Sequence, residues 1–220
     1  VLNTKDNSKE PDYLKAFPYV NGGLFRDTIV SPKFSLKARK IILECGNLNW
    51  SEINPDIFGS MIQAVVNPEY RSGLGMHYTS VPNIMKVIEP LFLNELNEEF
   101  EKSKESPAKL KKLLHRLSKI KLFDPACGSG NFLIIAYKEL RRLEIKILQQ
   151  IHDLESQVSI VFTQIKLSQC YGIELDDFAH EMAILSLWLA EHQMNKEFVD
   201  ELHDFGKAKL AIQPKITSQA

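Results

Sequence analysis

The residues best placed for chemistry lie between Leu122 and Leu133, in the run LFDPACGSGNFL. The apolar residues before Asp124 predict the end of a buried parallel strand, with this carboxylate at its carboxyl end. Gly128 and Gly130 permit a tight turn and a close approach of backbone, and a helical pattern follows them. Because ligands of parallel α/β sheets bind at the carboxyl ends of the strands, the run predicts a nucleotide-type cofactor site.

The spacing of the glycines narrows the class of ligand. The dinucleotide fingerprint G-x-G-x-x-G requires a third glycine where Leu133 stands, and no G-x-x-x-x-G-K-[ST] run occurs in the chain. A nucleoside cofactor without phosphates therefore fits better. The Asp124 carboxylate can accept hydrogen bonds from an ammonium group, and backbone at the glycines can approach a carboxylate and a sugar. S-adenosylmethionine carries all of these groups.

A second acidic residue follows a second predicted strand. The run from Gln169 to Asp176, QCYGIELD, predicts a strand, and an amphipathic helix is expected from about Asp177 to Met194. Glu174 would then lie at the carboxyl end of this strand, where an acidic side chain can bind both ribose hydroxyls. Leu175 would lie against the adenine ring. Alternatively, Glu174 only caps the next helix. The glycine turn upstream favours the cofactor interpretation.

Two of these runs resemble a known family. DPACGSGNFL and YGIELDDFA resemble motifs I and II of class I DNA methyltransferases that modify an exocyclic amine, chiefly that of adenine. Upstream runs beginning at Phe17 (FPYVNGGLF), Ile53 (INPDIFGS) and Gly75 (GMHYTS) resemble one branch especially. In that branch, the large single-polypeptide restriction-modification enzymes, a nuclease, a helical connector, an adenine methyltransferase and a target-recognition domain follow one another.

The resemblance implies a set of S-adenosylmethionine-binding residues. The family's Gly-x-x-Tyr-Thr segment, motif X, lines the methionine end of the cofactor. Thr79 or Ser80 can also serve as an N-cap, with Pro82 in the first turn of a helix from Val81. The implied cofactor-binding residues are Tyr78, Thr79, Asp124, Pro125, Ala126, Cys127, Gly128, Gly130, Asn131, Glu174 and Leu175.

No catalytic residue is predicted. Transfer to an amine in this family uses an Asn-Pro-Pro-aromatic tetrad, which does not occur in the sequence, so the chain alone is expected to be inactive. The run NPEY at Asn67 has Glu for the second Pro and lies too close to Tyr78 for the intervening strands. The three cysteines are widely spaced, which argues against zinc and fits a reducing cytoplasm. Cys127 lies where the turn needs small residues, which favours packing over a thiolate role.

Composition sets the broad class. The 220 residues are 44% hydrophobic and 25% charged, which is ordinary for a soluble cytoplasmic protein, and no membrane span or signal peptide is predicted. A protein that binds DNA on its own usually carries an excess of positive charge, whereas this chain has a net charge of −1. Double-stranded DNA is therefore expected as a partner only through the full-length protein. A lysine-rich helix face is interpreted as solvated: Lys109, Lys111, Lys112, Arg116 and Lys119.

The expected fold class is α/β, with a helical N-terminal region followed by the first part of a Rossmann-like sheet of an S-adenosylmethionine-dependent methyltransferase. Residues 1–75 are expected to form a helical connector with an irregular N-terminal arm. Residues 76–220 would be the N-terminal, cofactor-binding part of a methyltransferase domain, truncated before its catalytic half. An open sheet edge makes a dimer through that edge possible.

Individual elements are predicted from capping and periodicity. The expected helices cover residues 36–45, 55–66, 81–102 (bent at Pro90), 107–119 and a long helical crossover, more than one helix, within 139–169. A third strand is expected near Leu210, and Trp188 is expected in the core.

Two alternatives from other classes stay open. One is an RNA or small-molecule methyltransferase with the same cofactor half. The other is a non-enzymatic helical docking module in which the glycine loop no longer functions.

Overall fold

A computed structural model of the chain describes residues 12, 33–47, 57, 79–155 and 162–202. Helix α2 (Leu36–Gly46) belongs to one compact unit, and all other described helices and strands belong to a second. The predicted helix over residues 55–66, apart from residue 57, and the predicted strand near Leu210 lie outside the described residues.

Helix α2 begins where its cap predicts. Ser35 has extended backbone, and its side chain accepts a hydrogen bond from the backbone N–H of Ala38 at 3.2 Å.

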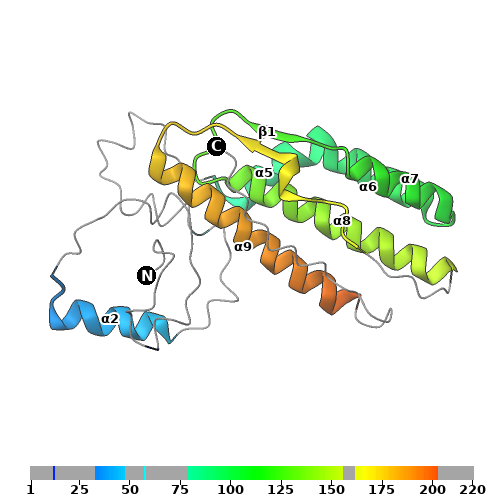
Figure 1. Cartoon of the computed structure of the whole chain (residues 1–220). Helices are drawn as coiled ribbons and strands as arrows, with labels where there is room; N and C mark the ends of the chain where they lie inside the picture. The colour runs from blue at the N-terminus through cyan, green and yellow to red at the C-terminus, as the bar shows by residue number, and fades with distance from the viewer. Residues whose placement is uncertain (1–11, 13–32, 48–56, 58–78, 156–161, 203–220) are drawn as a thin grey trace. The chain divides into compact units, whose positions relative to one another are not determined.

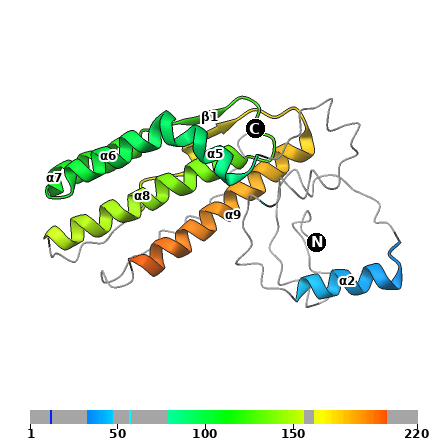
Figure 2. The same cartoon turned by 180° about the vertical axis from the view of Figure 1, so that it is seen from behind.

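The second unit is mostly helical and contains a small parallel sheet. Its elements are α5 (Val81–Ile88), the π-helical turn η3 (Glu89–Leu93), α6 (Asn94–Ser103), α7 (Pro107–Leu117), β1 (Leu122–Asp124), α8 (Asn131–Glu155), the 3₁₀ helix η4 (Leu167–Gln169), β2 (Cys170–Gly172) and α9 (Asp177–Glu201). Helix α8 lies between α7 and α9, as both views show (Figures 1 and 2), and it also contacts both strands. The predicted α/β class is therefore confirmed only in its coarse form.

Helix α7 buries the apolar face that its leucine spacing predicts. The core residues it shares with α8 and α9 include Leu110, Leu113, Leu114, Leu117, Leu140, Ile147, Met194 and Phe198. At about 25 cal/mol per Å² of apolar surface, this shared core supplies the main attraction between the three helices.

The bend predicted at Pro90 takes the form of a π-helical turn. Proline has no N–H to donate to the preceding turn, and the backbone N–H of Asn94 reaches back to the carbonyl of Glu89, five residues earlier. Helices α5 and α6 thus continue through this turn.

The strands are shorter and more exposed than predicted. They pair in parallel, Leu122 with Cys170 and Asp124 with Gly172. Leu122 and Cys170 pack against the helical core, whereas Phe123 remains 62% exposed on the other side. The expectation of a buried strand was wrong because, among the described residues, helices pack against only one face of this sheet.

Three helical predictions also need correction. Trp188 is 45% exposed, because α9 turns small residues toward α8 instead: Ala179, Ala183, Ser186 and Ala190 are all buried. Helix α9 continues past Met194 to Glu201, since Phe198 is buried as well. Within the described residues the crossover holds one 25-residue α-helix, α8, plus the short η4, rather than a longer helical excursion.

No helix among the described residues is long and apolar enough to cross a membrane. Pairing of two copies through the sheet edge stays a prediction.

Candidate functional site

The glycine turn joins β1 to α8 in the way its sequence predicts. Gly128 and Gly130 have φ values of +54° and +83°, in the left-handed region that favours glycine. A Cβ at Gly130 would stand 3.3 Å from that of Ala183, so the turn packs closely on α9. A Cβ at Gly128 would meet no atom of the described residues within 4 Å, so this part of the chain leaves that backbone open to a ligand.

Three hydrogen bonds tie this turn to the loop after β2. The N–H of Ile173 donates to the carbonyl of Asp124, and the N–H of Cys127 donates to the carbonyl of Ile173, both at 3.0 Å. The N–H of Gly128 donates to Oε2 of Glu174 at 2.7 Å. The structure thus brings together residues of the two predicted runs that lie 46 positions apart in the chain.

The Glu174 carboxylate is held by backbone from both loops. Its Oε1 accepts from the N–H groups of Leu175 and Asp176, at 2.8 and 2.9 Å. The cap of α9 is instead Asp176, which accepts from the N–H of Ala179 at 2.7 Å. Glu174 faces the glycine turn and does not cap the helix; a carboxylate offers about four acceptor sites, so one remains for a ligand.

The other predicted residues of the turn differ in exposure. Asp124 is half-buried; its Oδ1 accepts from the N–H of Ala126 at 3.1 Å, and Oδ2 has no partner among the described residues. Pro125 and Ala126 are exposed, whereas Asn131 is buried and accepts from Ser129 Oγ at 3.4 Å. Leu175 is 90% exposed and open to a flat ligand.

Cys127 is a packed thiol. Its Sγ lies 2.7 Å from the point where a Cβ on Gly172 would be, so the thiol fills the space that this glycine leaves. Burial raises the pKa of Cys127, and the nearby charges of Asp124 and Glu174 raise it further. Both observations support a packing role rather than a thiolate.

The motif X residues are not joined to these loops by any described bond. Tyr78 lies outside the described residues, and Thr79 is half-buried. Ser80 is the N-cap of α5 with Pro82 in the first turn, as predicted, but its carbonyl rather than its side chain accepts from the N–H groups of Asn83 and Ile84.

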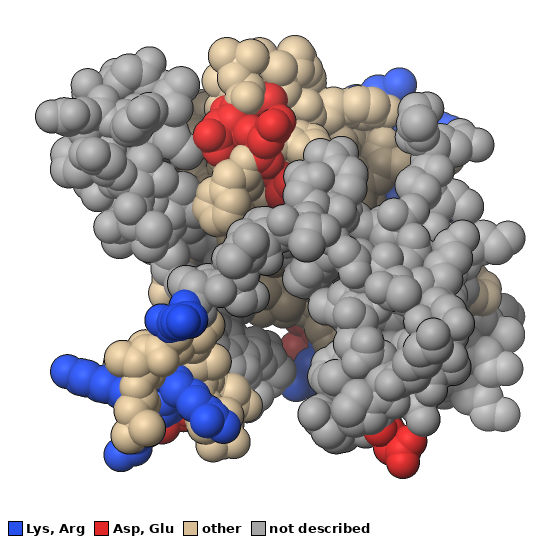
Figure 3. Space-filling view, turned by 60° about the vertical axis from the view of Figure 1, so that its left-hand side comes forward, with Lys and Arg blue, Asp and Glu red and all other residues tan. Residues whose placement is uncertain are grey.

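The edge formed by these loops is acidic. Asp124, Glu174, Asp176 and Asp177 all lie at or just beyond the strand ends, and acidic side chains gather compactly on one face of the molecule (Figure 3). Such an edge suits a cationic ligand better than a phosphate. Among the described residues no group of three His, Cys, Asp or Glu is placed to hold a metal ion.

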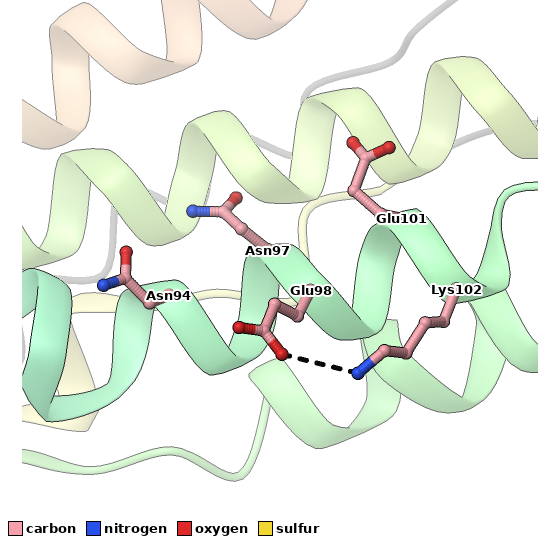
Figure 4. A pocket seen from close by; sticks show the side chains of 5 residues that line it. All are labelled: Asn94, Asn97, Glu98, Glu101 and Lys102. Atoms are coloured by element: carbon pink, nitrogen blue, oxygen red, sulfur yellow. Dashed lines mark hydrogen bonds and ion pairs between the residues drawn. The ribbon is translucent and has the colours of Figure 1, made fainter.

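A hollow lies elsewhere, on the outer face of α6. Its lining residues are Asn94, Asn97, Glu98, Glu101 and Lys102, and a 3.4 Å ion pair joins Glu98 to Lys102 (Figure 4). All five side chains come from one face of a single helix and include none of the predicted cofactor residues. We therefore locate the candidate site at the two loops.

The basic face of α7 is partly neutralised within the molecule. Arg116 pairs with Glu95 and Glu99 of α6, and these hydrogen bonds raise its pKa. Lys111 pairs with Glu155 of α8 at 2.6 Å. These pairs favour the interpretation of a solvated face over a DNA-binding one.

Comparison with known proteins identifies the family. The family model described as MmeI, DNA-methyltransferase domain, matches residues 100–217, more than half of the chain. The chain belongs to the MmeI-type DNA methyltransferases. This confirms the resemblance to DNA methyltransferases of restriction-modification systems.

Individual relatives of this MmeI-type chain agree with this family assignment. DNA methyltransferase A of Bacillus subtilis (strain 168) is 59% identical over 213 residues, which are 96% of this chain and 24% of that protein. A Methanocaldococcus jannaschii protein, named provisionally as a type II restriction enzyme and methyltransferase, is 33% identical over 86% of this chain and 20% of its own. The solved structure of the type IIL restriction-modification enzyme MmeI in complex with DNA matches with a TM-score of 0.79 and 42% identity, over 97% of this chain and 29% of that one. The chain thus spans a quarter or less of the length of the curated relatives it matches.

Sequence reasoning missed two residues of the site region, Gly172 and Asp176. It also missed Gln169 at the other end of the strands, whose buried side-chain amide donates to two carbonyls in the segment before β1. Asp176 had a signal, since Asp directly before a helical run is a common N-cap. The roles of Gly172 and Gln169 depend on contacts across the two strands, which no local pattern shows.

Proposed function

We propose that the chain binds S-adenosylmethionine at the loops after β1 and β2, as the cofactor-binding part of a site-specific DNA adenine methyltransferase of a restriction-modification system. The observation that carries the proposal is the meeting of Asp124, Gly128 and Glu174 at one acidic edge, where no other described residue covers the Gly128 backbone. Bound there, S-adenosylmethionine supplies an electrophilic methyl group on a sulfonium.

The residues present fit the groups of this cofactor. Oδ2 of Asp124, which has no partner among the described residues, can accept from the methionine ammonium. Glu174 can offer its remaining acceptor site, and the site now taken by Gly128, to ribose hydroxyls. Leu175 can pack on adenine, while Tyr78 and Thr79 would close the methionine end.

Domain organisation and partner complete the proposal. Residues 76–220 would form the N-terminal part of the methyltransferase domain, and double-stranded DNA would bind through the longer protein. Because the sequence has no Asn-Pro-Pro-aromatic run, the chain alone is not expected to methylate DNA. The family match supports DNA over RNA or small molecules as the substrate class.

Calorimetry with two ligands tests the site. Asp124→Asn keeps an oxygen for the Ala126 N–H but loses the charge, so affinity for S-adenosylmethionine should fall about tenfold or more. Affinity for 5′-methylthioadenosine, which lacks the amino-acid end, should not change. Glu174→Gln should weaken both ligands.

The matched control is Asp153→Asn, the same change on an exposed residue of α8. Equal losses for the two ligands in Asp124→Asn, or none, would contradict the assignment of Asp124. Binding unaffected by both site variants would refute the proposed site.

A further inference from the structure

Gln169 lies at the opposite end of the two strands from the candidate site, directly before β2. Its side chain is 9% exposed. The amide nitrogen donates to the carbonyls of Leu117 and Ile120, at 3.0 and 2.8 Å, and the amide oxygen accepts from the N–H of Lys166 at 2.8 Å. Both amide protons and the oxygen are thus used within the protein.

These partners belong to the segments that lead into the strands. Leu117 is the last residue of α7, and Ile120 stands in the turn just before β1. Lys166 precedes η4, which leads into β2. One buried side chain therefore fastens the starts of both strands to each other.

The sheet needs such a fastening because its ladder is short. Each strand has three residues, and their register pairs Leu122 with Cys170 and Asp124 with Gly172. Register is weakly specified in short, exposed strands, and a shift of one residue turns every side chain to the other face. It would also separate the Gly128 N–H from Glu174.

At the end of the strands that carries the two loops, a steric contact also favours the observed register. A Cβ at Gly172 would lie 2.7 Å from Cys127 Sγ, so a shift that places Tyr171 or Ile173 there is excluded. This contact rejects wrong registers, but it does not itself bind the strands together.

We propose that Gln169 is a positioning residue that fixes the register of β1 and β2. By fixing this register, it keeps Asp124 and Glu174 at the same edge of the sheet, on the two sides of the cofactor site. The cofactor part of this inference rests on the proposed function. The part that concerns register does not.

Hydrogen exchange on the 220-residue chain tests the register role. Gln169→Met keeps the side-chain length and removes all three hydrogen bonds. Exchange at the loop amides of Cys127, Gly128 and Ile173 should become about tenfold faster, while the α6 amide of Phe100 should be unchanged. The control is Gln149→Met: the Gln149 amide nitrogen donates to the carbonyl and to Oε2 of Glu201 in α9, and its loss should leave all of these amides unchanged.

Leu113→Ala supplies the comparison for general destabilisation, because Leu113 is fully buried in the core that the three long helices share. It should accelerate exchange through the whole unit. If Gln169→Met shows that same uniform pattern, or leaves the loop amides unchanged, the positioning role is wrong.

Calorimetry with S-adenosylmethionine then tests the link to the cofactor. Affinity should fall about tenfold in Gln169→Met and stay unchanged in Gln149→Met and in the folded fraction of Leu113→Ala. If the unmodified chain does not bind, the proposed function fails while the exchange experiment still decides the register role. If binding is equal in the unmodified chain and Gln169→Met despite faster loop exchange, Gln169 does not position the cofactor site.

Discussion

Glu174 joins two loops through one carboxylate. Its oxygens accept three backbone N–H groups, one from the glycine turn and two from its own loop, at 2.7 to 2.9 Å. Hydrogen bonds to a charged acceptor contribute about 1.5–3 kcal/mol each when desolvated, so the carboxylate is oriented before any ligand arrives. A ribose would need to share or replace only the bond from Gly128.

Cys127 offers a label inside the proposed site. Burial and two neighbouring carboxylates raise its pKa, so the reactive thiolate is scarce at neutral pH. We expect its alkylation rate to rise steadily from pH 7 to 9 without a plateau, as measured by mass spectrometry. Added S-adenosylmethionine should slow the reaction.

Cys170 is the internal control for this labelling. Burial raises its pKa to about 11, so it should react more slowly than Cys127 at each pH and show no protection by the cofactor. A rate at Cys127 that levels off below pH 8 would instead show an activated thiolate.

Among elements, the π-helical turn η3 keeps two buried faces in line. Ile84 and Ile88 of α5 and Leu96 and Phe100 of α6 are all buried. A regular helix turns by about 100° per residue, so it would place Phe100 about 160° around the helix axis from Ile84. The π-helical turn η3 absorbs one extra residue, which reduces this angle to about 60°. Pro90 favours the turn, but the buried faces require it.

Deletion and insertion at this turn should therefore have opposite results. Leu91 is exposed. Deleting Leu91 in a chain that also carries Pro90→Ala should give a regular helix that keeps both faces buried. The unfolding free energy should then change by less than about 1 kcal/mol. Inserting an alanine after Leu91 should misalign the faces and cost more than about 2 kcal/mol.

Urea denaturation followed by circular dichroism measures both changes, with Pro90→Ala alone as the control. Equal destabilisation by deletion and insertion would show that the turn has no role in aligning the faces.

The sequence predicts which face of a helix is buried only when the apolar residues of that helix lie on one face. Helix α7 has a single leucine stripe, and this stripe is the face that the helix buries. Helix α9 carries large apolar residues around much of its circumference, so the pattern could not show that alanines face α8 and that Trp188 points outward. The glycine turn was predictable because positive φ leaves a local signature, whereas the Gln169 contacts join residues about 50 positions apart.

Across the second unit as a whole, a buried ionic network joins α8, α9 and the segment leading to β2. Arg141 donates to Tyr137 Oη, Asn195 Oδ1 and the carbonyl of Met194, at 2.8, 3.1 and 3.4 Å. Its Nε lies 3.2 Å from Glu144 Oε2, an ion pair without hydrogen-bond geometry, and both side chains are 0% exposed. Glu144 in turn accepts from Thr163 Oγ1 at 2.7 Å and the N–H of Gln164 at 2.5 Å.

The sequence does not distinguish this network from an ordinary surface pair. Arg141 and Glu144 are three residues apart, and so are Glu139 and Arg142, which pair at 2.7 Å on the exposed side of the same helix. Only the packing of α7 and α9 around α8 decides which arginine is buried. The two arginines are therefore a matched pair for mutation.

Arg141→Met should cost about 3–5 kcal/mol of unfolding free energy, because it leaves the Glu144 charge buried without a cation. Arg142→Met should cost less than about 1 kcal/mol, since Arg142 is exposed. Urea denaturation measures both, and similar losses would contradict a special role for the buried pair. The double variant Arg141→Met/Glu144→Met should lose less than the sum of its single variants.

The cost of Arg141→Met should also depend on pH. Burial raises the pKa of Glu144, while Arg141 lowers it, so removing Arg141 raises this pKa further. A carboxyl with a raised folded pKa stabilises the fold fully below its unfolded pKa, near 4.3, and loses that contribution as pH rises through the folded value. Protonation can therefore relieve the unpaired charge more readily at pH 5 than at pH 8. The loss in Arg141→Met should be larger at pH 8, and a loss that is equal at both values would show that Glu144 stays ionised throughout.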